Sequence, residues 1–124
     1  MLRLTMILIG VAGFAGAILR FWLGAWIGRR WTSPFPMGTF VINIAGAFAL
    51  GLLIGLSDRQ LVPAAWRLVL GTGFLGAFTT FSTWMLETAH LTRTRSYLTA
   101  AANVVTSILC GLGAAGLGLA VARL

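Results

Sequence analysis

Polar side chains recur inside four strongly apolar stretches of this sequence, where hydrogen-bonding groups are costly and usually mark a pathway or a site. The densest group is GAFTTFSTWMLE, residues 76–87, which contains four hydroxyl side chains and one carboxylate. The remaining groups are Arg20, the pair Thr39 and Asn43, and the set Asn103, Thr106 and Ser107. Serine and threonine can bond to carbonyls of their own helix, but an asparagine amide is not satisfied so locally. The asparagines are therefore harder to explain without a function.

These residue types favour a path for a small anion. Amides and hydroxyls donate hydrogen bonds without carrying charge, the edges of aromatic rings are electropositive, and the most deeply placed charge is on Arg20. A cation path would need acidic side chains or ranks of carbonyls. Proton-coupled export usually depends on a carboxylate deep in a span, whereas the acidic candidate here, Glu87, lies toward the end of the third apolar stretch.

The elements that must position these side chains are predicted to be four membrane-spanning helices. Charged residues make up 9% of the chain and the mean hydropathy is +0.96, whereas a soluble domain carries about 25% charge. Each apolar stretch is long enough for a helix to cross about 30 Å of hydrocarbon. We therefore expect an all-α membrane protein with one domain over residues 1–124. The four spans are expected at about 4–28, 37–56, 66–90 and 97–122.

The third span is predicted to be broken near its middle. Gly71, Gly73 and Gly76 precede Thr79 and Thr80, and both residue types are weak helix formers. Unwound backbone at membrane depth is tolerated where it is buried in protein or lines a cavity. Its free carbonyls could hold a small hard cation such as Na⁺, as at other broken helices.

The arginines give no preferred orientation in the membrane. With the spans placed as above, Arg20 lies within the membrane and four arginines lie at each end. The bias of positive charge that normally fixes orientation is therefore missing. If the chain inserts both ways, opposite copies can pair as an antiparallel dimer about an in-plane two-fold axis. The scattered arginines form no basic stripe, so no nucleic-acid partner is expected.

Three motifs resemble those of the Fluc (CrcB) fluoride channels, and the resemblance covers essentially the whole chain. They are GFAGAILRF at 13–21, PMGTFVINIAGAFALGLLIG at 36–55 and GAFTTFSTWMLE at 76–87, with a weaker match in NVVTS at 103–107. The resemblance implies a passive channel that exports fluoride across the cell (inner) membrane. It also implies a dual-topology antiparallel homodimer with two pores and a structural Na⁺ at its centre.

The resemblance further implies roles for individual residues. The fluoride pore would involve Arg20, Thr39, Asn43, Phe81, Ser82, Trp84, Glu87 and Ser107. The backbone carbonyls of Gly76 and Thr79 would bind the Na⁺. Trp84 stands where the family has phenylalanine. It is bulkier and adds an indole N–H donor, so it could narrow the pore or bind the anion directly. Two further departures are Ala77, in place of a glycine, and Phe21, in place of a tyrosine.

Other interpretations of the sequence stay open. A proton-coupled exporter of cations, of the small multidrug resistance type, fits the size, span number and charge balance. Its chemistry needs a glutamate in the first span, and the span at 4–28 has none. A membrane scaffold would explain the glycines but not Asn43 or the TTFST run. An enzyme is not expected, because His90 and Cys110 stand alone and no nucleophile and base pair is evident. A signal peptide at the N-terminus is disfavoured because the apolar run continues beyond its possible cleavage site.

Overall fold

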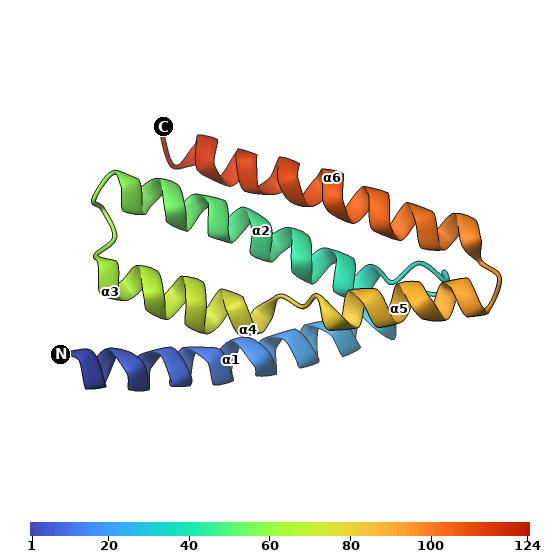
Figure 1. Cartoon of the computed structure of the whole chain (residues 1–124), viewed down its shortest axis with the longest axis horizontal. Coiled ribbons are helices and arrows are strands. Elements are labelled where there is room, and N and C mark those ends of the chain that lie inside the picture. Colours follow the sequence, from blue (N-terminus) through green and yellow to red (C-terminus); the bar gives the residue numbers. More distant parts are fainter.

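The computed structural model describes residues 1–124 and is helical throughout (Figure 1). Four helical stretches are long and apolar enough to cross a membrane. They are α1 (Leu2–Gly28), α2 (Met37–Asp58), a composite third span (Ala64–Arg93) and α6 (Tyr97–Val121). The predicted all-α architecture with four spans is confirmed, and both termini lie at the same end of the molecule (Figure 1).

The helix ends follow from local sequence. Pro36 and Pro63 stand immediately before α2 and the third span, where a missing N–H costs no helical hydrogen bond. At the other ends, Gln60 and Arg95 take left-handed backbone conformations, with φ of 58° and 60°. The N–H groups of the next residues, Leu61 and Ser96, then donate back to carbonyls in the last turns of α2 and α5. This pattern of bonds ends a helix sharply and turns the chain back.

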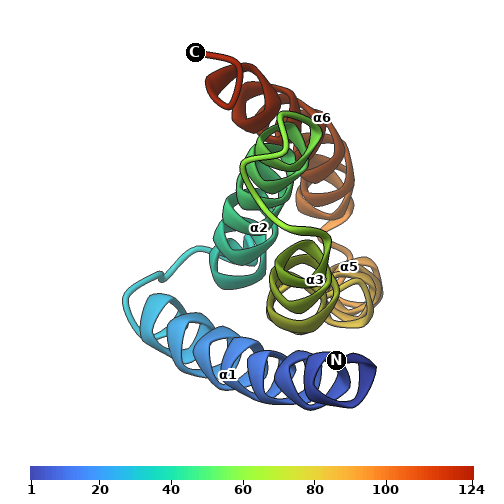
Figure 2. The same ribbon diagram turned by 90° about the vertical axis from the view of Figure 1, so that its left-hand side faces the viewer.

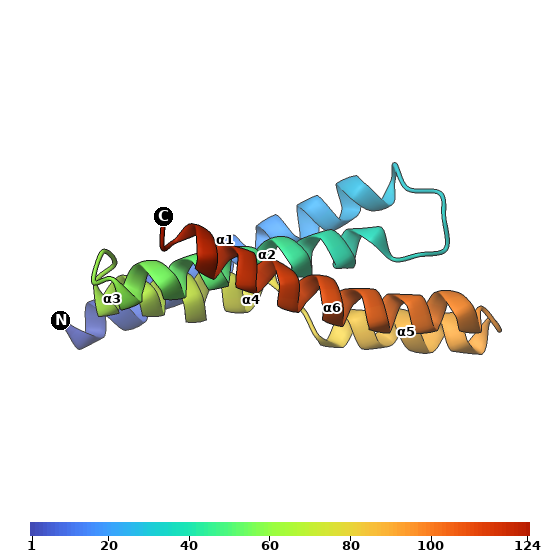
Figure 3. The same cartoon turned by 90° about the horizontal axis from the view of Figure 1, so that it is seen from above.

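Neighbouring spans pack side by side, and α1 also contacts α2 while α5 (Ser82–Arg93) also contacts α6. Viewed end on, the order runs from α6 through α2 and the third span to α1 (Figure 2). The most extensive contact is between α2 and α6, and α1 packs mainly against the first half of the third span. Seen from above, α1 diverges from the other helices toward its C-terminal end (Figure 3). Only 16 of the 124 residues are buried, so most apolar side chains are left to contact lipid or another protein.

Glycines allow α2 and α6 to approach closely. A Cβ added at Gly51 of α2 would overlap the Ala115 carbonyl of α6, and one added at Gly118 of α6 would overlap the Phe48 carbonyl of α2. Lipid supplies no hydrophobic drive between helices, so backbone contact at small residues stabilises the pair.

The third span consists of four pieces, and the predicted break near its middle is present. The pieces are α3 (Ala64–Arg67), a π-helical stretch η1 (Leu68–Leu75), α4 (Gly76–Phe78) and α5 (Ser82–Arg93). The helix opens only at residues 79–81, where Thr79 is extended, with ψ of 160°. Of the residues expected to weaken the helix, the glycines do not open it, because Gly71 and Gly73 lie within η1 and Gly76 begins α4. Gly73 serves packing instead, since an added Cβ would lie 2.7 Å from the Ile9 carbonyl oxygen of α1.

Candidate functional site

Asn43 connects α2 to the break in the third span through two hydrogen bonds. Its Nδ2 donates to the Thr80 carbonyl at 2.9 Å, and its Oδ1 accepts from the Thr80 N–H at 2.9 Å. An uncharged amide is suited to this because it carries donor and acceptor on one group. One side chain of α2 thus satisfies both backbone groups of an unwound residue.

The break leaves the backbone carbonyls of Gly76 and Thr79 outside the helical hydrogen-bond pattern. In a continuous helix the Thr80 N–H would donate to Gly76, but it donates to Asn43 instead. The Thr83 N–H would donate to Thr79, but it donates to Thr80 Oγ1 at 3.2 Å. The Thr79 carbonyl accepts instead from Arg20 Nη1 at 3.3 Å, which occupies one of its two lone pairs. Both carbonyl oxygens are hard ligands of the kind that binds Na⁺.

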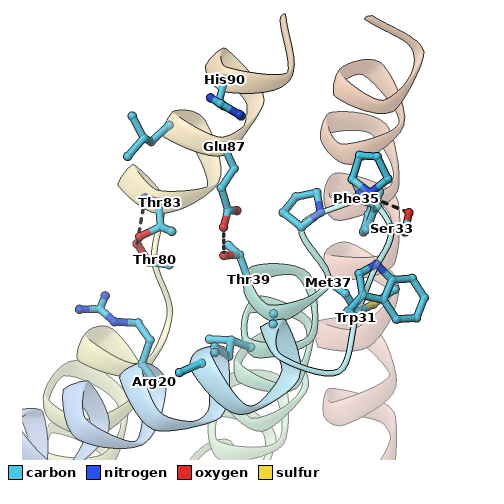
Figure 4. A pocket seen from close by; sticks show the side chains of 18 of the residues that line it. Arg20, Trp31, Ser33, Phe35, Met37, Thr39, Thr80, Thr83, Glu87 and His90 are labelled. Carbon is cyan, nitrogen blue, oxygen red and sulfur yellow. Dashed lines mark hydrogen bonds between the residues drawn. The ribbon is translucent and has the colours of Figure 1, made fainter. Parts of the chain in front are cut away.

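A large cavity opens between α1, the start of α2 and α5. Its volume is about 1020 Å³, and Arg20, Thr39, Glu87 and His90 contribute to its lining (Figure 4). Thr39 Oγ1 donates to Glu87 Oε1 at 2.8 Å, which joins α2 to α5. The other carboxylate oxygen, Oε2, is the one buried side-chain polar atom without a hydrogen-bond partner. The chain alone therefore leaves this carboxylate incompletely satisfied.

A smaller cavity of about 530 Å³ lies between α2, the third span and α6. Phe81 and Trp84 both line it, with their rings edge to face at a centroid distance of 5.6 Å and an angle of 74°. Phe81 is 70% exposed, although it is a large aromatic residue. Thr80 lines both cavities, so each of them borders the unwound segment.

The structure divides the predicted pore residues between these two cavities. Asn43, Phe81, Trp84 and Ser107 surround the smaller one, and Arg20, Thr39 and Glu87 line the larger one. Ser82 lines neither, and its hydroxyl lies 3.4 Å from Thr80 Oγ1. The geometry thus gathers four of these residues at one cavity and three at the other, and their roles toward an ion stay predictions.

Several residues gain importance that the sequence did not reveal. Thr80 is the partner of Asn43 and is shared by both cavities; its place in the TTFST run was the available signal. Asn103 is fully buried and donates to Thr88 Oγ1 at 2.9 Å, and nothing in the sequence pointed to Thr88. The Trp84 N–H, which the sequence suggested could bind the anion directly, donates to the Asn103 carbonyl at 3.4 Å.

Comparisons with known proteins give one consistent result. Residues 7–119 match the family model described as CrcB-like protein, camphor resistance (CrcB). The chain is 50% identical to a protein of Symbiobacterium thermophilum named fluoride-specific ion channel FluC 1, over 94% of this chain and 96% of that one. It is 44% identical to fluoride-specific ion channel FluC of Oceanobacillus iheyensis, over 95% and 91%. Identity to fluoride-specific ion channel FluC 2 of Mycobacterium tuberculosis is 47%, over 90% and 86%.

Proposed function

This chain belongs to the CrcB family, and from that premise we propose that it is a passive, fluoride-selective channel that exports fluoride from the cell. One observation carries the proposal: the chain is similar over nearly its whole length to proteins named fluoride-specific ion channels. The family consists of ion channels, so the chain is a multi-pass membrane protein and not an enzyme. The same match favours a channel over the proton-coupled exporter, and we place the protein in the cell (inner) membrane.

The mechanism follows from the hydration of fluoride. The ion is small and strongly hydrated, so a channel must replace its water with donors and still bind weakly enough for exit. Arg20 would attract anions into the larger cavity, whose lining it shares with Thr39 and Glu87. Beyond the unwound segment, the Asn43 N–H that does not bond to Thr80 and the ring edge of Phe81 would replace the hydration shell. The Ser107 hydroxyl would join them by turning from Asn103 Oδ1 to the ion. Chloride is larger and would need a wider site, so a narrow and rigid path would exclude it.

We further propose that two copies pair in opposite orientations and enclose two pores. The four-against-four balance of arginines, the termini at one end of the molecule and the exposed ring of Phe81 support this assembly. At the centre, the carbonyls of Gly76 and Thr79 from each copy would hold Na⁺. When bound, that ion would supply positive charge that joins the unwound segments of the two copies. Each copy would then need to contribute only half of the ligands.

Fluoride efflux from liposomes tests the proposed function. The purified protein is reconstituted into vesicles loaded with either fluoride or chloride, and efflux is followed with ion-selective electrodes. We expect rapid fluoride efflux once a potassium ionophore balances the charge, with chloride efflux no faster than in protein-free vesicles. The need for the ionophore separates passive conduction of an anion from electroneutral exchange.

Two results of this experiment would contradict the proposal. Fluoride efflux equal to that of protein-free vesicles would exclude a fluoride channel, and chloride efflux at the fluoride rate would exclude selectivity. Replacing external Na⁺ by a large organic cation tests the central ion separately. Loss of assembly or transport on removal of Na⁺ is expected, and unchanged behaviour at very low Na⁺ would argue against the Na⁺ site alone.

A further inference from the structure

Trp84 of α5 is linked to Asn103 of α6 in two ways, directly through its indole N–H and indirectly through the Thr88 hydroxyl. Its indole N–H donates directly to the backbone carbonyl of Asn103 at 3.4 Å. Its own backbone carbonyl accepts from Thr88 Oγ1 at 2.8 Å, and that hydroxyl oxygen in turn accepts from Asn103 Nδ2 at 2.9 Å. The bonds form a closed circuit between α5 and α6 that runs through Trp84, Thr88 and Asn103.

The amide of Asn103 has no access to either cavity. Its residue is 0% exposed, the only large side chain buried to that degree, and it is absent from the lining of both cavities. Its donor is used by Thr88, and its acceptor lies 3.5 Å from Ser107 Oγ. Asn103 therefore does not contact an ion in the path, and its influence must pass through neighbours.

Building on the proposed function, we infer that Thr88 and Asn103 are positioning residues for Trp84, holding its N–H away from the ion path. Trp84 then offers fluoride the carbon-bound hydrogens of its ring, as a phenylalanine would, and not a strong N–H donor. The hydrogen bond from the Asn103 side-chain amide to Thr88 sets the spacing of α5 and α6. This spacing keeps the indole N–H within reach of the Asn103 carbonyl. A bulkier aromatic is thus accommodated without adding a donor that would trap the ion.

The test in transport is a double-mutant cycle, with Thr88→Val as the main change. Valine is similar in shape to threonine but lacks the hydroxyl, so it removes the link from the Asn103 side chain to the Trp84 backbone and leaves the direct indole bond to be held without it. We expect Thr88→Val to slow fluoride efflux by roughly five- to tenfold when Trp84 is present, and by no more than about twofold in a Trp84→Phe background. Thr88→Ser, which keeps the hydroxyl, should restore the rate. The matched control is Thr92→Val, one turn further along α5, because the Thr92 hydroxyl bonds only to the Thr88 carbonyl and is exposed.

The test in structure does not depend on transport. The chain has five tryptophans, so a ¹H–¹⁵N spectrum of the protein in micelles resolves their indole N–H signals, and Trp84→Phe identifies the one from Trp84. We expect this signal to move upfield in Thr88→Val and to stay in place in Thr88→Ser. Adding fluoride should shift it no more than adding chloride does, because the N–H is already engaged.

Three results would overturn the inference. One is an equal slowing by Thr88→Val with and without the indole, which would mean that Thr88 acts on folding or on the ion itself. Another is a Trp84 indole N–H signal whose chemical shift is unchanged in Thr88→Val. The third is a downfield shift of that signal that fluoride causes and chloride does not. If wild-type vesicles conduct no fluoride, the proposed function fails, and the indole signal still decides whether Thr88 positions Trp84.

Discussion

Asn43 is the residue whose replacement most directly tests the site. We expect Asn43→Asp to reduce fluoride efflux from liposomes to the leak of protein-free vesicles. An ionised carboxylate only accepts hydrogen bonds. It therefore cannot replace the Asn43 Nδ2 group, which in the wild type donates to the Thr80 carbonyl at 2.9 Å. It also places a negative charge beside the proposed anion path. Both effects act in the same direction.

The control for Asn43→Asp is Thr106→Val. Thr106 is also polar and within a span, but its hydroxyl bonds to the Ala102 carbonyl of its own helix at 2.6 Å. Its removal should leave fluoride efflux within about twofold of the wild type, because such bonds are local to one helix. Normal conduction by Asn43→Asp, in protein that elutes as the wild type does on size exclusion, would remove Asn43 from the pore.

Residue types were easier to predict from the sequence than their partners. The amide of Asn43 stood out because no local bond could satisfy it, and the structure gives it two bonds to Thr80. The preference for back-bonding by isolated threonines also held at Thr106. The engagement of the Trp84 N–H could not be foreseen, because it depends on how far α5 and α6 are rotated toward each other. Sequence spacing places residues on a face of one helix but does not set that rotation.

At the scale of the helices, the close contact between α2 and α6 should tolerate no added methyl group. We expect Gly118→Ala to destabilise the protein by about 1–3 kcal/mol, the usual range for overpacking, because the new Cβ would overlap the Phe48 carbonyl. Gly116→Ala is the matched control in the same helix, since nothing lies within 4 Å of a Cβ there. Thermal unfolding in detergent, followed by circular dichroism, measures both.

The outcome that would contradict this packing argument is an equal effect of the two alanines. Alanine has a higher helix propensity than glycine by about 1 kcal/mol, so Gly116→Ala should leave the melting temperature unchanged or raise it. A rise of the same size in Gly118→Ala would mean that α2 and α6 can separate without loss. The contact would then contribute little to stability.

The break in the third span shows what propensity can and cannot predict about an element. A break was expected because glycines and threonines are weak helix formers, and a break is present. Its position is set by tertiary contacts, since Asn43 captures the Thr80 backbone while Gly73 faces the backbone of α1. Glycine in a membrane helix has two uses, flexibility and close packing. The sequence alone does not distinguish them.

At the scale of the whole molecule, hydropathy was sufficient to predict four spans, because each must present a long apolar surface to lipid. The packing order of the helices and the strong pairing of α2 with α6 were not predictable, since every span is largely apolar and few positions distinguish one face from another. Pairing between copies depends on surfaces that a single chain leaves exposed, such as the ring of Phe81. It is therefore best tested through orientation in the membrane.

Orientation can be counted with a single cysteine in the loop between α1 and α2. In a Cys110→Ala background, Thr32→Cys should be labelled by a membrane-impermeant maleimide in about half of the molecules in intact cells, because balanced arginines do not favour either orientation. Adding Arg29→Gln and Arg30→Gln removes charge from that end, so the opposite end should stay inside and the labelled fraction should approach unity. Fluoride efflux should fall in parallel, because few inverted partners remain for an antiparallel pair. Complete labelling, or none, in the parent with all nine arginines would show a single orientation and exclude the antiparallel dimer.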